Sequence, residues 1–344
     1  MNPPKSQGMV EIRWLKDIES DAVFATKSIR RGTRIAAEVP LIIVPPVPRD
    51  DELSTFCEEI YKAPEDNVAK IAELSLLPLI RERAKKDHCT NQEVWAFYKS
   101  KRWKDSQGNF LRGKKLHKAI MKTMDLCNIF RVNSVYLGPE GKYGSGLFSL
   151  YSRMNHSCVP NVHNSYNPTL KQLTIHAIND IKTGEQIFVD YIGNACRTRQ
   201  QRAFHLYNTW GITCKCEACT QPQVNRLRCP AYECGASKEV NFSAIHNIPR
   251  VSTAAEALTI AEELVYLMKR QNLNSVELCR TLRECSKYAL GKGDRNRALN
   301  YAREELKLEK SLIGTETDHL KKHLRGAKYW LESIISTPSI VRRH

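Results

Sequence analysis

Three cysteines stand within six residues of one another, at Cys214, Cys216 and Cys219. Thiolates at this Cys-x-Cys-x-x-Cys spacing suit a tetrahedral Zn2+, and a structural zinc site takes four ligands. Because the loop supplies only three, the fourth must come from another segment. On the residues alone, the candidates for that ligand are Cys158, Cys196, His205, Cys229 and Cys234. The alternative is a set of buried, reduced thiols without metal, but such thiols usually occur singly. The spacing therefore predicts a metal site.

Two other segments could contribute chemistry, and both precede the cysteines. The first reads Asn155-His156-Ser157-Cys158-Val159-Pro160-Asn161. The second runs from Gly184 to Tyr191, with Tyr191 ending an apolar strand. Together with the cysteine loop, and in this order, they resemble the catalytic half of a SET-domain protein methyltransferase. The branch that the chain resembles is the SET-and-MYND group with its fungal relatives.

The resemblance implies a reaction and the residues that carry it. The reaction is transfer of a methyl group from S-adenosylmethionine to a lysine side-chain amine of a protein substrate. Tyr191 matches the family's catalytic tyrosine, and Phe130 and Trp210 match aromatic residues that line the lysine channel. The positions that match cofactor-binding residues are Ala22, Asn128, Asn155, His156, Tyr191 and Ile212. For zinc, the resemblance selects Cys158 as the fourth ligand, with Cys214, Cys216 and Cys219.

The chemistry of methyl transfer explains why an aromatic channel is expected. Free lysine is almost fully protonated at neutral pH, and a cationic amine cannot attack. A narrow aromatic channel desolvates the amine, which lowers its pKa, and aligns the nitrogen with the methyl group. Each residue also has a plainer explanation. Tyr191 fits a core strand, His156 a brace within its turn, Asn128 a helix cap and Phe130 ordinary packing.

Two departures from the family's pattern leave a rival function open. Where the family usually has Gly-x-Gly beside the cofactor, this chain has Ser20-Asp21-Ala22. Side chains there restrict the backbone and the space beside a ligand. Where the family often has Phe against the adenine, the chain has Ile212. The rival is a non-catalytic SET protein that acts as a chromatin or protein-interaction module.

The elements that must position these residues are expected to form an α+β protein. The resemblance implies a β-rich SET fold of small antiparallel sheets with knot-like C-terminal threading, a helical insert, a zinc-binding post-SET loop and an all-α C-terminal domain. The expected parts are N-terminal SET strands at 1–50, a helical SET-I-like insert at 51–125, the C-terminal SET core at 126–195, the post-SET zinc segment at 196–235 and tetratricopeptide-like helices at 250–340.

Periodicity supports this division. Apolar residues recur at helical spacing in 50–125 and 252–335, whereas 11–45 reads as short strands separated by turns. Residues 121–130 are predicted to end a helix and enter a strand, and 138–146 is predicted to be a hairpin.

The remaining cysteines carry less information. Cys57 and Cys89 stand alone in the first third of the chain, so the zinc finger of the SET-and-MYND branch is not expected. Cys229 and Cys234 either assist the first zinc site or are structural thiols in a hairpin, and the second is the simpler interpretation.

Charge limits the class of partners. The 344 residues carry a formal net charge of +16, a field that attracts nucleic acid, nucleosomes or acidic proteins. Residues 99–118 are rich in Lys and Arg, interleaved with Trp103, Phe110 and His117. This pattern fits nucleic-acid contact or, more commonly, a solvated helix face.

The compartment follows from what the sequence lacks. The N-terminal residues contain no apolar signal core, and no apolar run approaches the length of a membrane span. The twelve cysteines are therefore expected to be reduced or bound to zinc rather than paired in disulfides. We expect no membrane contact and an intracellular location, in the nucleus or the cytoplasm.

Overall fold

Four short strands open the chain, as the N-terminal pattern predicts. The structure, a computed structural model, describes residues 8–74, 92, 94–98, 108–193, 197–220, 253–315 and 326–336. Strands β1 (Val10–Leu15) and β2 (Ser20–Ala25) pair antiparallel as a hairpin. Strands β3 (Arg34–Glu38) and β4 (Ile42–Val44) join two separate sheets.

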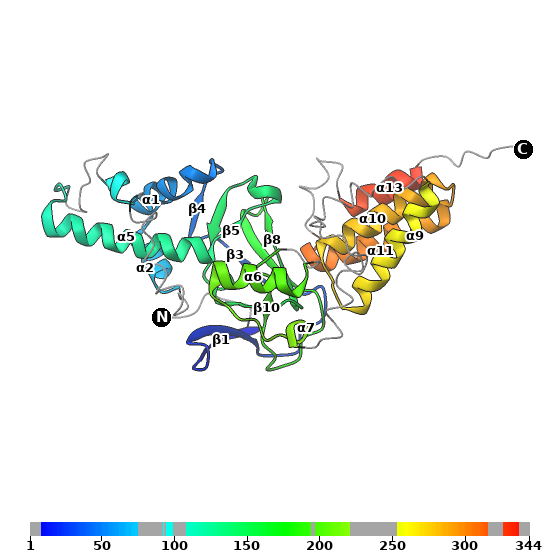
Figure 1. Cartoon of the computed structure of the whole chain (residues 1–344), viewed down its shortest axis with the longest axis horizontal. Coiled ribbons are helices and arrows are strands. Elements are labelled where there is room, and N and C mark those ends of the chain that lie inside the picture. The colour runs from blue at the N-terminus through cyan, green and yellow to red at the C-terminus, as the bar shows by residue number, and fades with distance from the viewer. Residues whose placement is uncertain are drawn as a thin grey trace, which may run out of the picture.

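Small sheets form the centre of the molecule (Figure 1). One has the order β3-β9-β8, in which β8 (Val162–Asn167) and β9 (Gln172–Ala177) pair antiparallel. The side chain of Asn167 closes their turn, because its Oδ1 accepts hydrogen bonds from the N–H groups of Thr169 and Leu170. Burying large apolar side chains stabilises such sheets by roughly 1.5–3 kcal/mol each. The shared buried cluster includes Val23, Ile35, Phe148, Leu173, Ile175 and Val189.

The hairpin predicted at 138–146 is confirmed. Strands β5 (Val135–Tyr136) and β6 (Ser145–Leu147) pair antiparallel, and β4 pairs with the other edge of β6. Gly144 allows this close approach, because its φ is +88° and a Cβ there would lie 1.9 Å from the carbonyl oxygen of Val44.

The insert is helical, but one part of its prediction is wrong. Its described helices are α1 (Glu52–Lys62), α2 (Glu65–Ala72) and α5 (Gly113–Asn133). Helix α5 continues unbroken through residues 121–130, where a helix end or a bend into a strand was expected. The side chains of Asn128 and Asn133 each donate to the carbonyl four residues earlier, which keeps them within the helix. This end of α5 is buried on most sides, so it lacks the one-sided periodicity that marks a surface helix.

Stacked rings hold α5 against α1. The ring centroids of Phe56 and Phe130 lie 4.4 Å apart with an interplanar angle of 24°, and both rings are buried. Beside them, the Sγ of Cys57 lies 3.7 Å from the Sγ of Cys127. Cys57 is thus part of the apolar core, and the packing fixes the C-terminal end of α5.

Helix α6 (Arg199–Trp210) has a well-defined beginning and end. Thr198 and Gln201 form a capping box, in which each side chain accepts a hydrogen bond from the other residue's backbone N–H. Gly211, with φ of +68°, ends the helix in the left-handed conformation. The helix therefore places Trp210 at its C-terminal end.

The C-terminal helices lie on the far side of the sheets from the insert (Figure 1). They are α9 (Ala254–Arg270), α10 (Val276–Gly291), α11 (Arg295–Ile313) and α13 (Ala327–Ser336). Helix α11 packs against β8 and β9, and Asn274 donates hydrogen bonds to Ile178 and Asn179 of the core. Within the bundle, Arg283 and Glu305 form a buried ion pair at 2.7 Å. None of the helices described is long and apolar enough to cross a membrane.

Candidate functional site

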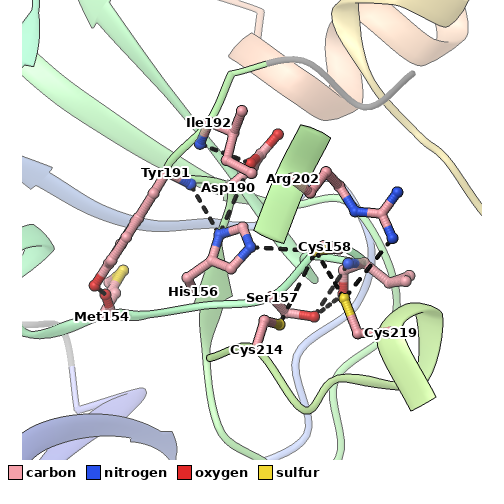
Figure 2. A network of polar contacts seen from close by, with 11 residues as sticks. Met154, His156, Ser157, Cys158, Asp190, Tyr191, Ile192, Arg202, Cys214 and Cys219 are labelled. Carbon is pink, nitrogen blue, oxygen red and sulfur yellow. Dashed lines mark hydrogen bonds and ion pairs between the residues drawn. The ribbon is translucent and has the colours of Figure 1, made fainter. Parts of the chain in front are cut away.

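Four sulfur atoms meet at one place in the structure, and Figure 2 shows Cys158, Cys214 and Cys219 among them. The Sγ atoms of Cys158, Cys214, Cys216 and Cys219 all lie within 4.8 Å of one another. The Sγ of Cys158 is 4.0 Å from the Sγ of Cys214 and 3.6 Å from the Sγ of Cys219. A tetrahedral zinc ion with Zn–S bonds of about 2.3 Å separates its sulfur atoms by about 3.8 Å. The donor set and the spacing therefore fit a structural zinc ion.

The cluster joins two segments that are distant in the sequence. Cys158 follows β7 (Asn155–His156), which pairs in parallel with β10 (Phe188–Val189). Cys219 lies in the short helix α7 (Glu217–Thr220), and its N–H donates to the carbonyl of Cys216 at 2.8 Å. A bound metal would thus fasten the chain after α6 to the turn that follows β7.

A buried cation lies beside the sulfur atoms. Arg202 of α6 is only 1% exposed, and its Nη2 donates to the carbonyl of Ala218 at 3.2 Å and lies 3.7 Å from the Sγ of Cys219. Its Nε has no hydrogen-bond partner among the residues described. Burial lowers the pKa of Arg202, but the sulfur atoms of Cys158 and Cys219 outweigh it and raise the pKa. The guanidinium therefore stays charged and offsets part of the negative charge of four thiolates.

The sulfur atoms share protons unequally without a metal. A hydrogen bond with Cys158 lowers the pKa of Cys219 to about 6, and Arg202 also favours the Cys219 thiolate. The pKa of Cys158 is raised, first by its hydrogen bond with Cys214. A divalent cation would instead take all four as thiolates, so metal binding is expected to release protons.

His156 connects this cluster to the segment that follows β10 (Figure 2). Its Nδ1 accepts a hydrogen bond from the N–H of Tyr191 at 3.1 Å, and its Nε2 lies 3.4 Å from the Sγ of Cys158. Since Nδ1 is an acceptor, the proton of a neutral ring lies on Nε2, from which it is donated to the sulfur. The imidazole therefore braces the metal loop against the segment that carries Tyr191.

Tyr191 occupies the centre of an aromatic group. Its ring centroid is 5.4 Å from that of His156 and 5.3 Å from that of Trp210. The hydroxyl donates to the carbonyl of Met154 at 2.6 Å, and the Nε1–H of Trp210 donates to the carbonyl of Val132 at 2.9 Å. Burial raises the pKa of Tyr191 well above its usual range, so the phenol stays protonated at neutral pH.

A pocket of about 1270 Å³ opens beside this group. Pockets for one small molecule usually measure about 300–1,000 Å³, so this one has room for a ligand and an entering side chain. Six of the predicted site residues line it: Asn128, Phe130, Asn155, Tyr191, Trp210 and Ile212. They come from α5, β7, the segment after β10, and the end of α6, which lie far apart in the sequence.

Two predicted cofactor residues lie elsewhere. Ala22 is fully buried in β2 and His156 is 9% exposed, and neither is among the described residues that line the pocket. From the Ser20-Asp21-Ala22 segment, it is Ser20 that lines the pocket. Contact of Ala22 or His156 with a cofactor stays a prediction. Of the other candidate zinc ligands, His205 lies in α6 outside the cysteine cluster, whereas Cys196, Cys229 and Cys234 lie outside the described residues.

Sequence reasoning missed Tyr151, which lines the same pocket. It begins the short helix η3 (Tyr151–Arg153), whose start is held by Glu38, because that buried carboxylate accepts from the N–H groups of Leu150 and Tyr151 at 2.7 and 2.8 Å. Burial raises the pKa of Tyr151, and proximity to Tyr191 adds to the rise. The only sequence signal was a tyrosine four residues before Asn155, which ordinary packing explains equally well.

The pocket continues to the C-terminal helices. Its lining includes Asn274, Glu277 and Arg280 from the start of α10, and Asp50 and Glu52 from the start of the insert. Glu52 also accepts a hydrogen bond from Ser145 at 2.8 Å. The walls therefore come from the insert, the SET-like core and the C-terminal bundle together.

Parts of this chain are similar in sequence to known proteins. "Histone-lysine N-methyltransferase set5" of Schizosaccharomyces pombe is 43% identical over 75 residues, which is 22% of this chain and 23% of that protein. Human "N-lysine methyltransferase SMYD2" is 36% identical over 102 residues, 30% of this chain and 22% of that protein. Human "Protein-lysine N-trimethyltransferase SMYD5" is 40% identical over 78 residues, 22% of this chain and 19% of that protein. The chain thus matches less than a quarter of the length of each.

The decisive match is to a family rather than to one protein. A solved SET domain of LSMT bound to lysine and AdoHcy aligns with 96% of this chain and 88% of that chain at 12% identity, with a TM-score of 0.39, too low to support an argument. The family model described as "SET domain" matches residues 21–192, which is half of the chain and contains the β7 and β10 strands beside the pocket. The chain therefore belongs to the SET-domain family.

Proposed function

We propose that this chain is an S-adenosylmethionine-dependent methyltransferase that acts on lysine side chains of proteins. The observation that supports it most is that Tyr191, Asn155 and Trp210, which the resemblance selected from three separate segments of the sequence, line one pocket. The names of the matching relatives describe lysine methylation, but those matches cover less than a quarter of each relative. The activity, the substrate and the partners of this chain are therefore parts of the proposal.

The aromatic residues form the proposed lysine channel. Tyr191 and Trp210 line the pocket together with Phe130, whose ring is stacked on Phe56. An amine that enters beside Tyr191 and Trp210 would lose water, which favours its neutral, nucleophilic form. The phenol of Tyr191 uses its proton to donate to Met154, so its oxygen remains available to accept an N–H from the amine. Tyr191 would thus orient the nitrogen rather than remove its proton.

The polar residues of the pocket form the proposed cofactor end. S-adenosylmethionine supplies an electrophilic methyl group on a sulfonium ion. The side-chain N–H of Asn128 already donates to the carbonyl of Met124, so its Oδ1 is the atom left to accept from a ligand. The Nδ2 of Asn155 is 3.4 Å from the carbonyl of Asp21, a long contact that a ligand could replace. Ile212 would cover the apolar side of the cofactor.

The proposed zinc ion would act on structure rather than on the reaction. Held by Cys158, Cys214, Cys216 and Cys219, it would fix the segment in which Ile212 lies two residues before Cys214. The ion would be bound by four thiolates, which leaves no open coordination position for a catalytic water, as in closed structural sites. The pocket wall would then be complete only in the metal-bound protein.

Calorimetry with S-adenosylmethionine tests the proposal against its rival, a non-catalytic interaction module. We expect saturable binding that Asn155→Ala weakens, and transfer of a labelled methyl group to proteins of a cell extract. The full burial of Ala22 is the observation that favours the rival, because this residue presents no surface to a ligand. Absence of binding at millimolar cofactor would leave only the module.

A further inference from the structure

The first half of α5 carries a surface that methyl transfer does not use. We call it the basic face, and it consists of Arg112, Lys114, Lys115, Lys118 and Lys122, all of them exposed. The sequence between Asp105 and Asp125 contains no acidic residue. A run of five cations over eleven residues therefore stands without any negative charge in its own segment.

The helix arranges these cations in a row. Lys114, Lys118 and Lys122 recur every four residues, so they lie on one side of α5, and Lys115 stands beside them. At a rise of about 1.5 Å per residue, the row from Lys114 to Lys122 is about 12 Å long.

This arrangement opposes the stability of the helix. Like charges four residues apart destabilise a helix by roughly 0.2–0.5 kcal/mol per pair, and cations near its beginning oppose the helix dipole. The first turn of α5 contains no acidic residue, and no side chain caps it. An external anion that bound this row would remove the repulsion.

Several lysines in other helices form ion pairs within their own helix. Lys62 in α1, Lys287 in α10 and Lys328 in α13 each form an ion pair with a glutamate three or four residues away. Among the residues described, no carboxylate forms an ion pair with Lys114, Lys118 or Lys122. Within the part of the chain that the structure describes, these three lysines of α5 therefore form a row without a carboxylate partner.

We propose that the basic face binds the phosphate backbone of duplex nucleic acid. Each strand of such a duplex carries one negative charge per about 3.4 Å of its axis, so a row of about 12 Å faces roughly three or four phosphates. An evenly spaced polyanion matches an evenly spaced row of ammonium groups, and the contact needs no base recognition. Exposed Met121 lies on the same stretch and adds no charge that would oppose it.

The course of α5 relates this surface to the pocket. The same helix carries Asn128 and Phe130, which line the pocket, ten or more residues after Lys118. At about 1.5 Å per residue, Lys118 and Asn128 are about 15 Å apart along the axis. In Figure 1 α5 runs from the outer edge of the insert to the sheets, so the basic face lies on the half of the helix that is remote from the sheets.

The proposal is tested by measuring the affinity of the chain for a short DNA duplex of arbitrary sequence. Fluorescence anisotropy reports this binding at several salt concentrations. Three to four phosphate contacts predict a slope of log affinity against log salt of about −3, which is a loss of roughly 60-fold between 50 and 200 mM salt. The test variant carries Lys114→Gln, Lys115→Gln, Lys118→Gln and Lys122→Gln, which preserve helix propensity.

A matched control separates the basic face from overall charge. It carries glutamine at four other exposed lysines, Lys27, Lys182, Lys292 and Lys307, and lowers the net charge of +16 by the same four units. We expect the α5 variant to lose most of the salt slope and at least tenfold in affinity at low salt, and the control to stay within about threefold of the wild type. Equal losses in the two variants would overturn the proposal.

Two further results keep the proposal open to refutation. Should the fourfold variant fail to fold, Lys118→Gln with Lys122→Gln should make the slope less steep by about 2, and an unchanged slope would overturn the proposal. Competition by polyglutamate as strong as by duplex DNA, at equal charge concentration, would show that the occupant is an acidic protein instead.

Discussion

Replacing Cys158 by serine should release the post-SET segment from the core while leaving the other three sulfur atoms in place. Cys158 is the ligand that comes from the turn after β7, whereas Cys214, Cys216 and Cys219 lie on one local loop. Without Cys158, the loop could still hold a metal ion, but the ion would no longer tie the two segments together.

The size of the effect follows from the loop that the site closes. Cys158 and Cys219 are 61 residues apart in the sequence, and the chain-entropy relation for a cross-link of this length gives about 4 kcal/mol. That free energy corresponds to about a thousandfold increase in local opening of the segment that contains Ile212.

Hydrogen–deuterium exchange of backbone amides measures this opening. The N–H of Ile212 donates to the carbonyl of Leu206 at 3.1 Å, so it reports on the end of α6, and amides of β9 serve as an internal reference. Cys279→Ser is the matched control, because Cys279 is a buried thiol of α10 outside the cluster. Exchange at Ile212 that rises by less than about threefold in Cys158→Ser would refute the cross-linking role.

Two other predictions concern stability. Burial lowers the pKa of both His163 and His176 to about 4. The charge of His176 lowers the pKa of His163 further, and the charge of Arg34 lowers that of His176 further. Because these pKa values lie below the unfolded value of about 6.5, stability is intact above pH 6.5 and is lost as the pH falls through 4, by roughly 3 kcal/mol per histidine. Urea unfolding between pH 7 and 4 should show the loss, and His176→Gln should remove about half of it; a variant with the wild-type pH dependence would contradict this origin. Gly144→Ala should destabilise the fold by roughly 1–3 kcal/mol or more, because its Cβ would collide with the carbonyl of Val44, and an unchanged urea midpoint would disprove the collision.

Residues whose chemistry is local were the ones that the sequence could predict. The spacing of Cys214, Cys216 and Cys219 predicts a metal site, and alternating apolar residues predict the strands around them. The resemblance then selected Cys158 from five candidates, and the structure places its sulfur within reach of the other three. No rule of spacing could have made that choice, because the contact joins segments some sixty residues apart.

Features that depend on tertiary packing were predicted less well. Asn128 and Phe130 were expected where a helix ends or bends into a strand, yet they lie within α5. The C-terminal end of that helix is buried on most sides, so it shows no one-sided apolar pattern. Tyr151 reaches the pocket because Glu38, more than a hundred residues earlier, holds the start of its turn. The contribution of Glu277 and Arg280 to the pocket depends on how the C-terminal bundle sits on β8 and β9. Such placements follow from contacts between distant segments, which periodicity does not contain.

The proposed reaction is tested most directly by single-turnover methyl transfer from labelled S-adenosylmethionine, with the wild type compared against Tyr191→Phe. The substitution keeps the ring between His156 and Trp210 but removes the hydroxyl that contacts Met154. We predict that the wild type places label on lysine and that the variant, with cofactor affinity retained, is slower by about 100-fold or more. Equal rates in the two proteins, or no labelled lysine with the wild type, would contradict the account.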